Sequence, residues 1–177
     1  MLTCSRIILL VALTAASLGR AEVASAAAPC WRPPVVGVVV DPFRAPPCTW
    51  CAGNRGLEYR VDGEVEVRAA ASGRVAYAGT VVDVGYVVVE LANGWRHTYG
   101  RLIDTRLDVG DLVLIGGLIG RADTNFFFGL RIDGGYADPA PFLGSIVGRP
   151  RLIPVDGSSP RPAPPPSIRC QVRRRFR

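Results

Sequence analysis

The chain has 177 residues, which is enough for one domain with extensions at its ends. Its hydrophobic fraction of 49% can supply a core and excludes an intrinsically disordered protein. The formal net charge is +6, and all 21 basic residues are arginine.

Residues 1–26 have the features of a secretory signal peptide. Arg6 supplies a positive charge, residues 7–18 form an apolar run, and Ala24-Ser25-Ala26 is a small-residue cleavage site. The alternative is an uncleaved membrane anchor. A spanning helix needs about 20 apolar residues, and Gly19-Arg20 interrupts the run. We therefore expect a cleaved signal and a protein that is secreted or held in the cell envelope.

Four cysteines follow this segment, namely Cys30, Cys48, Cys51 and Cys170. An even number of cysteines in an exported protein predicts two disulfides, and four cysteines allow three pairings. We favour Cys48–Cys51 as a local clip and Cys30–Cys170 as a link between the two tails. A four-thiolate zinc site is the alternative, but an oxidising compartment and the lack of a second Cys-x-x-Cys argue against it.

The middle of the chain has the two-residue periodicity of β-strands. Residues 27–52 form a Pro- and Cys-rich lead-in, in which residues 35–40 can form a short strand. Asn93-Gly94 predicts a hairpin turn and residues 133–135 a further turn. No segment after the signal is a convincing helix. The predicted strands are 64–69, 73–79, 86–91, 95–99, 112–115, 118–120 and 126–132. We expect an antiparallel all-β sandwich or barrel.

Residues 149–177 form a tail rich in proline and arginine. Within it, residues 157–169 have the composition of a polyproline-type linker, and residues 173–177 are four arginines and one phenylalanine. The tail can be a solvated terminus. Alternatively, it can make weak electrostatic contact with anionic envelope polymers or lipid headgroups.

Three short sequence patterns follow one another along the middle of the chain. They are Asn54-x-x-x-Glu58, Tyr99-Gly100-Arg101-Leu102 and Asn125-Phe126-Phe127-Phe128. Together they resemble the core of the lysostaphin-type (LytM-like) zinc metallopeptidases, which cut peptidoglycan cross-bridges. That family has His-x-x-x-Asp, Tyr-x-His-Leu and His-x-His-Phe at these places. The resemblance covers residues 53–143 and implies a β-sandwich or barrel-like core of the duplicated hybrid motif type, to which we assign residues 53–148.

The residues that carry the chemistry in this family are replaced here. The resemblance places Asn54, Glu58 and Phe127 at the zinc ligands, and Arg101 and Asn125 at the catalytic histidines. A catalytic zinc needs three protein ligands and an open position. Glu58 offers one oxygen, Asn54 a weak amide oxygen and Phe127 nothing. Moreover, the chain has one histidine, which is too few for a His-based zinc hydrolase. We expect no zinc cofactor.

The same positions are candidates for a binding cleft. We predict that Phe127 fills the metal position with an apolar ring, inside a polar rim of Asn54, Glu58, Arg101 and Asn125. His97 and Tyr99 share one strand face. Tyr99 matches the family tyrosine that lies two residues before the catalytic histidine, so the resemblance implies that both side chains look toward this cleft. Arg101 suits a carboxylate such as a peptide stem presents. The alternatives are a vestigial, well-packed site and an ordinary strand histidine.

The sequence therefore predicts a secreted, non-catalytic LytM-like domain that binds peptidoglycan or regulates a cell-wall hydrolase. One alternative is an active zinc metalloendopeptidase with an unorthodox site. Another is a disulfide-stabilised structural protein of the envelope. We expect a monomer and no nucleic-acid partner.

Overall fold

A computed structural model describes residues 29–48, 50–148, 154–163 and 165–170. The predicted signal peptide and the arginines at 173–177 lie outside the described residues. Within the described ranges, no helix is both long enough and apolar enough to cross a membrane.

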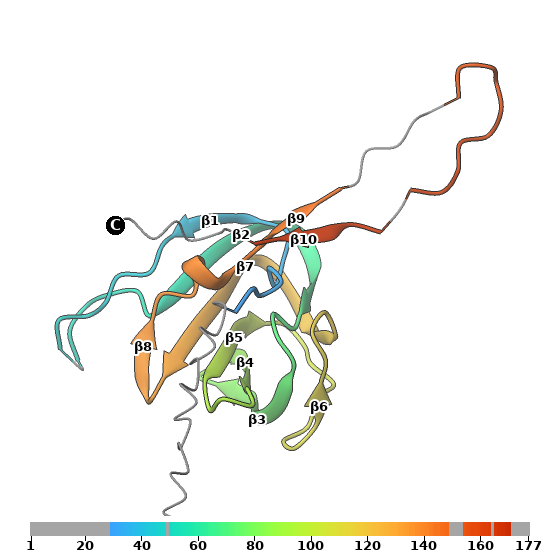
Figure 1. Ribbon diagram of the computed structural model, residues 1–177. Coiled ribbons are helices and arrows are strands. Elements are labelled where there is room, and N and C mark those ends of the chain that lie inside the picture. The colour runs from blue at the N-terminus through green and yellow to red at the C-terminus, as the bar shows by residue number, and fades with distance from the viewer. Residues whose placement is uncertain (1–28, 49, 149–153, 164, 171–177) are drawn as a thin grey trace, which may run out of the picture.

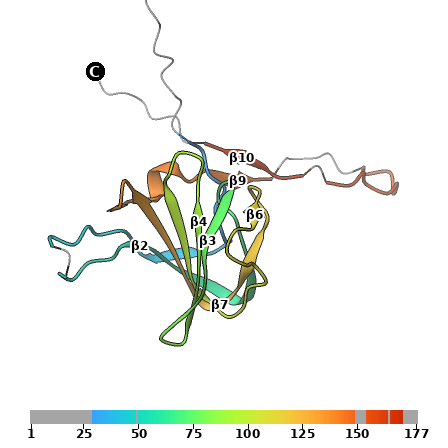
Figure 2. The same ribbon diagram turned by 90° about the horizontal axis from the view of Figure 1, so that it is seen from below.

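An antiparallel sheet of eight strands forms the body of the protein (Figure 1). Its strand order is β1-β2-β7-β5-β4-β3-β6, with β8 paired to the end of β7. The strands are β1 (Val38–Asp41), β2 (Gly56–Arg68), β3 (Gly73–Val81), β4 (Val84–Glu90), β5 (Arg96–Leu102), β6 (Leu112–Val113), β7 (Leu118–Ile132) and β8 (Gly135–Ala137). The order has two free edges, β1 and β6, and the sheet curls around its core (Figure 2).

A second, two-stranded sheet lies beside the first. It pairs β9 (Ser145–Val147) with β10 (Ser167–Arg169), and the 3-10 turn η1 (Ala140–Phe142) precedes it. Part of the segment predicted as a linker is therefore a strand. The described residues contain no α-helix, and the prediction of an antiparallel all-β fold is confirmed.

The core is built from alternate side chains of the sheet strands. Leu57, Tyr59 and Val61 of β2 face it, as do Phe126 and Phe128 of β7. The residues between them face away, onto what we call the outer face of the sheet. Burying one face of a strand fixes its register, since a slip of one residue would expose every apolar side chain.

Two strands are longer than the sequence periodicity predicts. β2 begins at Gly56, and β7 runs unbroken through the two stretches predicted as separate strands. Each contains one residue with positive φ, Gly63 at +67° and Thr124 at +62°. The β2–β7 register shifts between Arg60 and Glu64, so a local irregularity keeps the pairing continuous.

The lead-in and tail are fastened to this body. Cys30 pairs with Cys170 at a Cα–Cα distance of 5.7 Å, and Cys48 with Cys51 at 5.0 Å. Both predicted disulfides are confirmed. β1 comes from the lead-in and pairs with β2, and it overlaps the short strand predicted within residues 35–40.

Candidate functional site

Three of the predicted site positions meet on the outer face, on adjacent strands. Phe127 of β7 lies opposite Glu58 of β2 on one side and Gly100 of β5 on the other. Arg101 follows Gly100, and its guanidinium reaches across to Glu58. The Nε–Oε2 distance is 3.1 Å, and Nη2 donates to Oε1 at 3.2 Å. A two-point ion pair thus joins the positions that the sequence resemblance assigns to a zinc ligand and a catalytic histidine.

A β-bulge aims Arg101 at Glu58. The β4–β5 register passes from Tyr86–Gly100 directly to Gly85–Leu102, which leaves Arg101 as the extra residue. Its φ is +60°, a conformation that costs an L-residue about 1–2 kcal/mol. Bulges redirect side chains, and this one puts Arg101 on the outer face although Tyr99, two residues earlier, faces the core.

The prediction that His97 and Tyr99 look toward the cleft is wrong. Both side chains are fully buried, and the Tyr99 hydroxyl accepts a hydrogen bond from the Ala70 backbone N–H at 2.8 Å. The ring of His97 packs against Trp31, with 4.2 Å between centroids, and against Phe128 at 5.2 Å. The inference assumed unbroken alternation from Tyr99 to Arg101, and the bulge breaks it.

His97 has no partner for either ring nitrogen among the described residues. Burial lowers its pKa to about 4, so the imidazole is neutral at pH 7. Because the ring is enclosed by Trp31 and Phe128 on the core side of the sheet, it has no access to a ligand on the outer face.

Asn54 is also absent from the predicted rim. Its side chain is buried, and Nδ2 donates to the carbonyl oxygens of Asp41 and Pro42 at 3.0 and 3.1 Å. Its Oδ1 accepts from the Gly56 N–H at 3.3 Å. Asn54 therefore ties the exit of β1 to the start of β2, a contact with the lead-in that the family pattern does not contain.

The ring of Phe127 rests on glycine backbone. A Cβ placed on Gly56, Gly129 or Gly100 would come within 2.6, 2.9 or 3.2 Å of its ring atoms. These three glycines, one on each of β2, β7 and β5, leave the space that the half-buried ring fills. Asn125, two residues earlier on β7, is exposed and lies opposite Arg60.

These residues do not fit the zinc ion that the fold family implies. The Glu58 carboxylate holds Arg101, the Asn54 amide is committed to backbone groups, and Phe127 has no donor atom. Across the described ranges, no group of three or more His, Cys, Asp or Glu side chains is arranged to hold a metal ion. No step of a reaction is therefore assigned to zinc at this position.

A groove continues along the outer face from Phe127. Its first part is a cavity of about 250 Å³ that reaches from Phe127 and Tyr86 to Arg131 and Tyr136. Its second part, of about 1130 Å³, lies against the Cys48–Cys51 loop and includes Trp50. Both parts are lined by Arg55, Arg131 and Tyr136. The sequence interpretation missed this region, although Arg131 shares the alternation of Phe127 and the turn at 133–135 returns the chain beside it.

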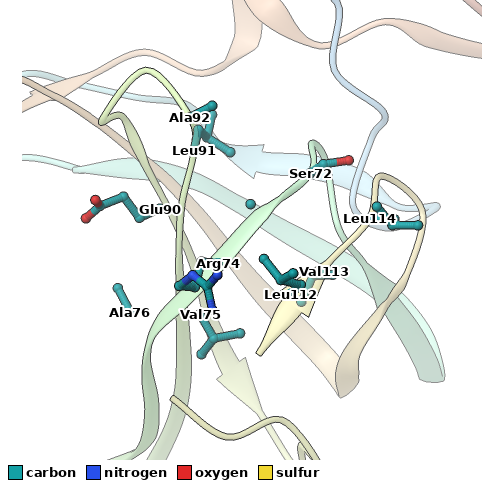
Figure 3. Close-up of a pocket in the computed structure, with 11 residues that line it drawn as sticks. Ser72, Arg74, Val75, Ala76, Glu90, Leu91, Ala92, Leu112, Val113 and Leu114 are labelled. Atoms are coloured by element: carbon teal, nitrogen blue, oxygen red, sulfur yellow. The ribbon is translucent and has the colours of Figure 1, made fainter. Parts of the chain in front are cut away.

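A second hollow lies at the far edge of the sheet, between β3 and β6 (Figure 3). Its volume is about 610 Å³. Val75, Leu91, Leu112 and Leu114 line it, with Arg74 and Glu90 among the other lining residues. Leu112 and Leu114 are 72% and 74% exposed, so this edge presents apolar surface.

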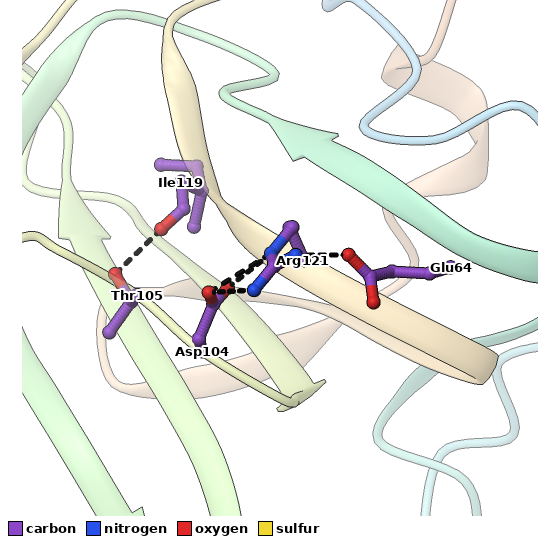
Figure 4. Close-up of polar contacts among 5 residues, drawn as sticks. All are labelled: Glu64, Asp104, Thr105, Ile119 and Arg121. Carbon is purple, nitrogen blue, oxygen red and sulfur yellow. Dashed lines mark hydrogen bonds and ion pairs between the residues drawn. The ribbon is translucent and has the colours of Figure 1, made fainter.

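An ion-pair cluster joins three parts of the chain away from the groove (Figure 4). Arg121 of β7 pairs with Glu64 of β2 and with Asp104 in the loop after β5. The hydrogen bond from Arg121 lowers the pKa of the Asp104 carboxyl. Nearby, the Thr105 hydroxyl donates to the Ile119 carbonyl at 2.7 Å. The cluster is exposed and fixes loop geometry rather than a ligand site.

The strand order and the positions on β2, β5 and β7 define a lysostaphin-type (LytM-like) β-sheet domain with an altered metal site. Residues 52–137 match the model of peptidase family M23. No curated protein shows significant sequence similarity to the chain.

Solved structures share the fold at low identity. One is the SpoIIQ–SpoIIIAH pore-forming complex, with a TM-score of 0.58, 22% identity, and coverage of 66% of this chain and 92% of that one. Csd3 from Helicobacter pylori has a TM-score of 0.59 and 20% sequence identity, and the match covers 66% of this chain and 35% of Csd3. The catalytic domain of the antimicrobial peptidase lysostaphin from Staphylococcus simulans has a TM-score of 0.52 and 20% sequence identity. That match covers 60% of this chain and 91% of the lysostaphin domain.

Proposed function

We propose that this protein is an exported, non-catalytic M23 domain that binds peptidoglycan through the outer face of its sheet. The observation that carries the proposal is the Glu58–Arg101 ion pair beside Phe127, at the positions that the sequence resemblance assigns to the family's zinc and catalytic histidines. A metallopeptidase needs an open coordination position for water. Here an ion pair and a ring packed on three glycines occupy that place.

The groove supports binding without cleavage. Arg101 is 49% exposed and Glu58 22%, so the guanidinium keeps donors that a ligand carboxylate can reach. Phe127 and Tyr136 add aromatic surface along the same face. Peptidoglycan stems present carboxylates next to sugars and apolar side chains, which matches this mixture of cationic and aromatic groups.

The first experiment measures zinc and lytic activity in the mature, disulfide-intact protein. We expect well under one zinc per chain by elemental analysis after dialysis against micromolar zinc. We also expect no release of fragments from purified sacculi. Stoichiometric zinc with sacculus cleavage would establish the rival reading, an active metalloendopeptidase.

The second experiment measures retention on sacculi. We expect the wild type to pellet with them and Arg101→Ala to bind roughly tenfold more weakly, because a hydrogen-bonded charged group is lost. Arg106→Ala is the matched control, since it removes the same charge from an exposed loop position. Absence of wild-type retention would defeat the proposal and leave a structural envelope role.

A second candidate function is regulation of a wall hydrolase through a protein contact. The exposed Leu112 and Leu114 at the β3–β6 edge favour it, and the similar SpoIIQ fold occurs in a complex with SpoIIIAH. If this function is correct, we expect the wild type to stimulate a hydrolase. The variant Leu112→Asp/Leu114→Asp should lose that stimulation and keep its retention on sacculi. Equal stimulation by both proteins would reject it.

A further inference from the structure

The hairpin of β7 and β8 brings a cation and a phenol together at the end of the groove. Asp133 and Gly134 form its two-residue turn, with φ of +50° and +81°. Positive φ at both positions is the geometry of a type I′ hairpin. It sets Arg131 directly opposite Tyr136, and Arg131 Nη2 donates to the Tyr136 hydroxyl at 2.5 Å.

A second guanidinium lies at the same ring. The Cζ of Arg131 is 4.4 Å from the Tyr136 centroid and that of Arg55 is 5.3 Å. Arg55 is held there by β2, which starts next to it, and its Nη2 donates to the Cys51 carbonyl at 3.4 Å. In the described ranges no carboxylate forms an ion pair with Arg131. A ligand anion beside this pair of guanidinium groups would be attracted by both positive charges.

The same end of the groove carries an exposed indole. Trp50, between the bridged Cys48 and Cys51, is 93% exposed and lines the cavity together with Arg55, Arg131 and Tyr136. Trp50 thus adds an exposed indole to the part of the groove that Tyr136 lines. Aromatic rings of this kind stack on sugar or peptide faces, with the polar edge left in solvent.

We propose that Arg131, Tyr136 and Arg55 form a binding site for the terminal carboxylate of a peptidoglycan stem peptide, with Trp50 covering the adjoining residue or sugar. The inference rests on the proposed function and names the part of the ligand that this end of the groove takes. It assigns a second contact region on the outer face, separate from Arg101 and Glu58.

The hydrogen-bond inventory of these groups matches a carboxylate. The Tyr136 hydroxyl accepts from Arg131, which leaves its own hydrogen to donate to an oxygen of the ligand. The planar guanidinium of Arg131 retains further N–H donors in a fork that fits two carboxylate oxygens. A neutral amide at the same place would leave one donor facing an NH₂ group.

The test uses the mature protein with both disulfides and a disaccharide–tetrapeptide fragment of peptidoglycan. Titration calorimetry compares the fragment bearing a free terminal carboxylate with the same fragment bearing a terminal amide. We expect the carboxylate form to bind at least tenfold more tightly. Arg131→Gln should remove that preference and Tyr136→Phe should reduce it, whereas Arg106→Gln, an exposed arginine elsewhere, should leave it intact.

Three results would overturn the inference: equal affinity for both forms, equal loss in Arg131→Gln and Arg106→Gln, or competition by inorganic phosphate as strong as by the carboxylate fragment. Circular dichroism checks that Arg131→Gln is folded, and Tyr136→Phe keeps the test decisive if it is not. Sacculus retention separates the two proposals. Normal retention with no carboxylate preference overturns this inference alone, whereas loss of wild-type retention overturns the proposed function.

Discussion

At the scale of single residues, polar side chains on the outer face and in the core differ in whether they have partners. Arg101 and Glu58 satisfy one another on the outer face, where water reaches both. His97 is fully buried among aromatic rings, with neither nitrogen bonded within the described residues. An unsatisfied buried polar group costs stability, so His97 is a weak point of the core rather than a functional group.

The burial of His97 predicts a specific acid sensitivity. Its pKa is about 4 in the folded protein and near 6.5 when unfolded, so between these values the unfolded chain binds a proton that the native state does not. Stability is therefore complete above pH 6.5 and falls as the pH drops toward 4. The loss is roughly 3 kcal/mol at 1.36 kcal/mol per pKa unit.

The variant His97→Phe should show that loss reduced by about 3 kcal/mol, because a phenyl ring does not titrate. Urea denaturation at pH 7 and pH 4 measures the free energy of unfolding of both proteins. Carboxylates also titrate in this range, but they do so in both proteins and cancel in the comparison. An identical pH dependence in the two proteins would contradict the assignment.

Sequence alternation anticipated part of this arrangement. Alternation along a strand puts Phe126 and Phe128 on one face and Phe127 on the other, and the structure agrees. It misplaced His97 because the β-bulge at Arg101 reverses the alternation, and an arginine does not indicate a bulge in a sequence. It misplaced Asn54 because the hydrogen-bond partners of that side chain lie in the lead-in, outside the family pattern.

At the scale of elements, the hairpins differ in how well their sequences suit their turns. Gly94 takes a φ of +79°, and Asn93 Oδ1 accepts from the Trp95 N–H at 3.2 Å. That turn was predictable from Asn-Gly. The β3–β4 hairpin turns on Val82 and Asp83, with φ of +46° and +65°. A β-branched residue rarely adopts positive φ, so no sequence signal marked this turn.

Replacing this turn with a matched one should stabilise the protein. The double change Val82→Asn/Asp83→Gly supplies residues that adopt positive φ readily, and we expect a gain of about 1–2 kcal/mol. Val82 is 90% exposed, so little packing is lost. Thermal and urea unfolding measure the gain.

The control is Val36→Asn, another exposed valine, at 83%, whose φ is not positive. It should give no comparable stabilisation. If the double change and Val36→Asn shifted stability equally, the gain would come from removing surface apolar groups, and the turn strain would be disproved.

At the scale of the whole molecule, two covalent links act over very different distances. Cys30–Cys170 joins residues 140 positions apart. The segment next to Cys30 is also held by a hydrogen bond, which the Trp31 N–H donates to the Phe142 carbonyl at 2.8 Å. Cys48–Cys51 closes a loop of 3 positions next to the proposed carboxylate site. The number of cysteines and the expected export predicted two disulfides, and the pairing that we favoured is the observed one. Nothing in the residue pattern indicated that the short link borders a groove.

The two links should therefore fail in different ways. In the chain-entropy model, a loop of 140 residues contributes about 5 kcal/mol and one of 3 residues under 2 kcal/mol. We expect Cys30→Ser/Cys170→Ser to lower the free energy of unfolding by several kcal/mol and to leave carboxylate binding intact in the fraction that stays folded. Cys48→Ser/Cys51→Ser should lower the free energy of unfolding only slightly but weaken carboxylate binding, because Trp50 loses its fixed position. Urea denaturation and calorimetry on both variants decide this, and equal destabilisation by the two pairs would show that loop length does not govern their contribution.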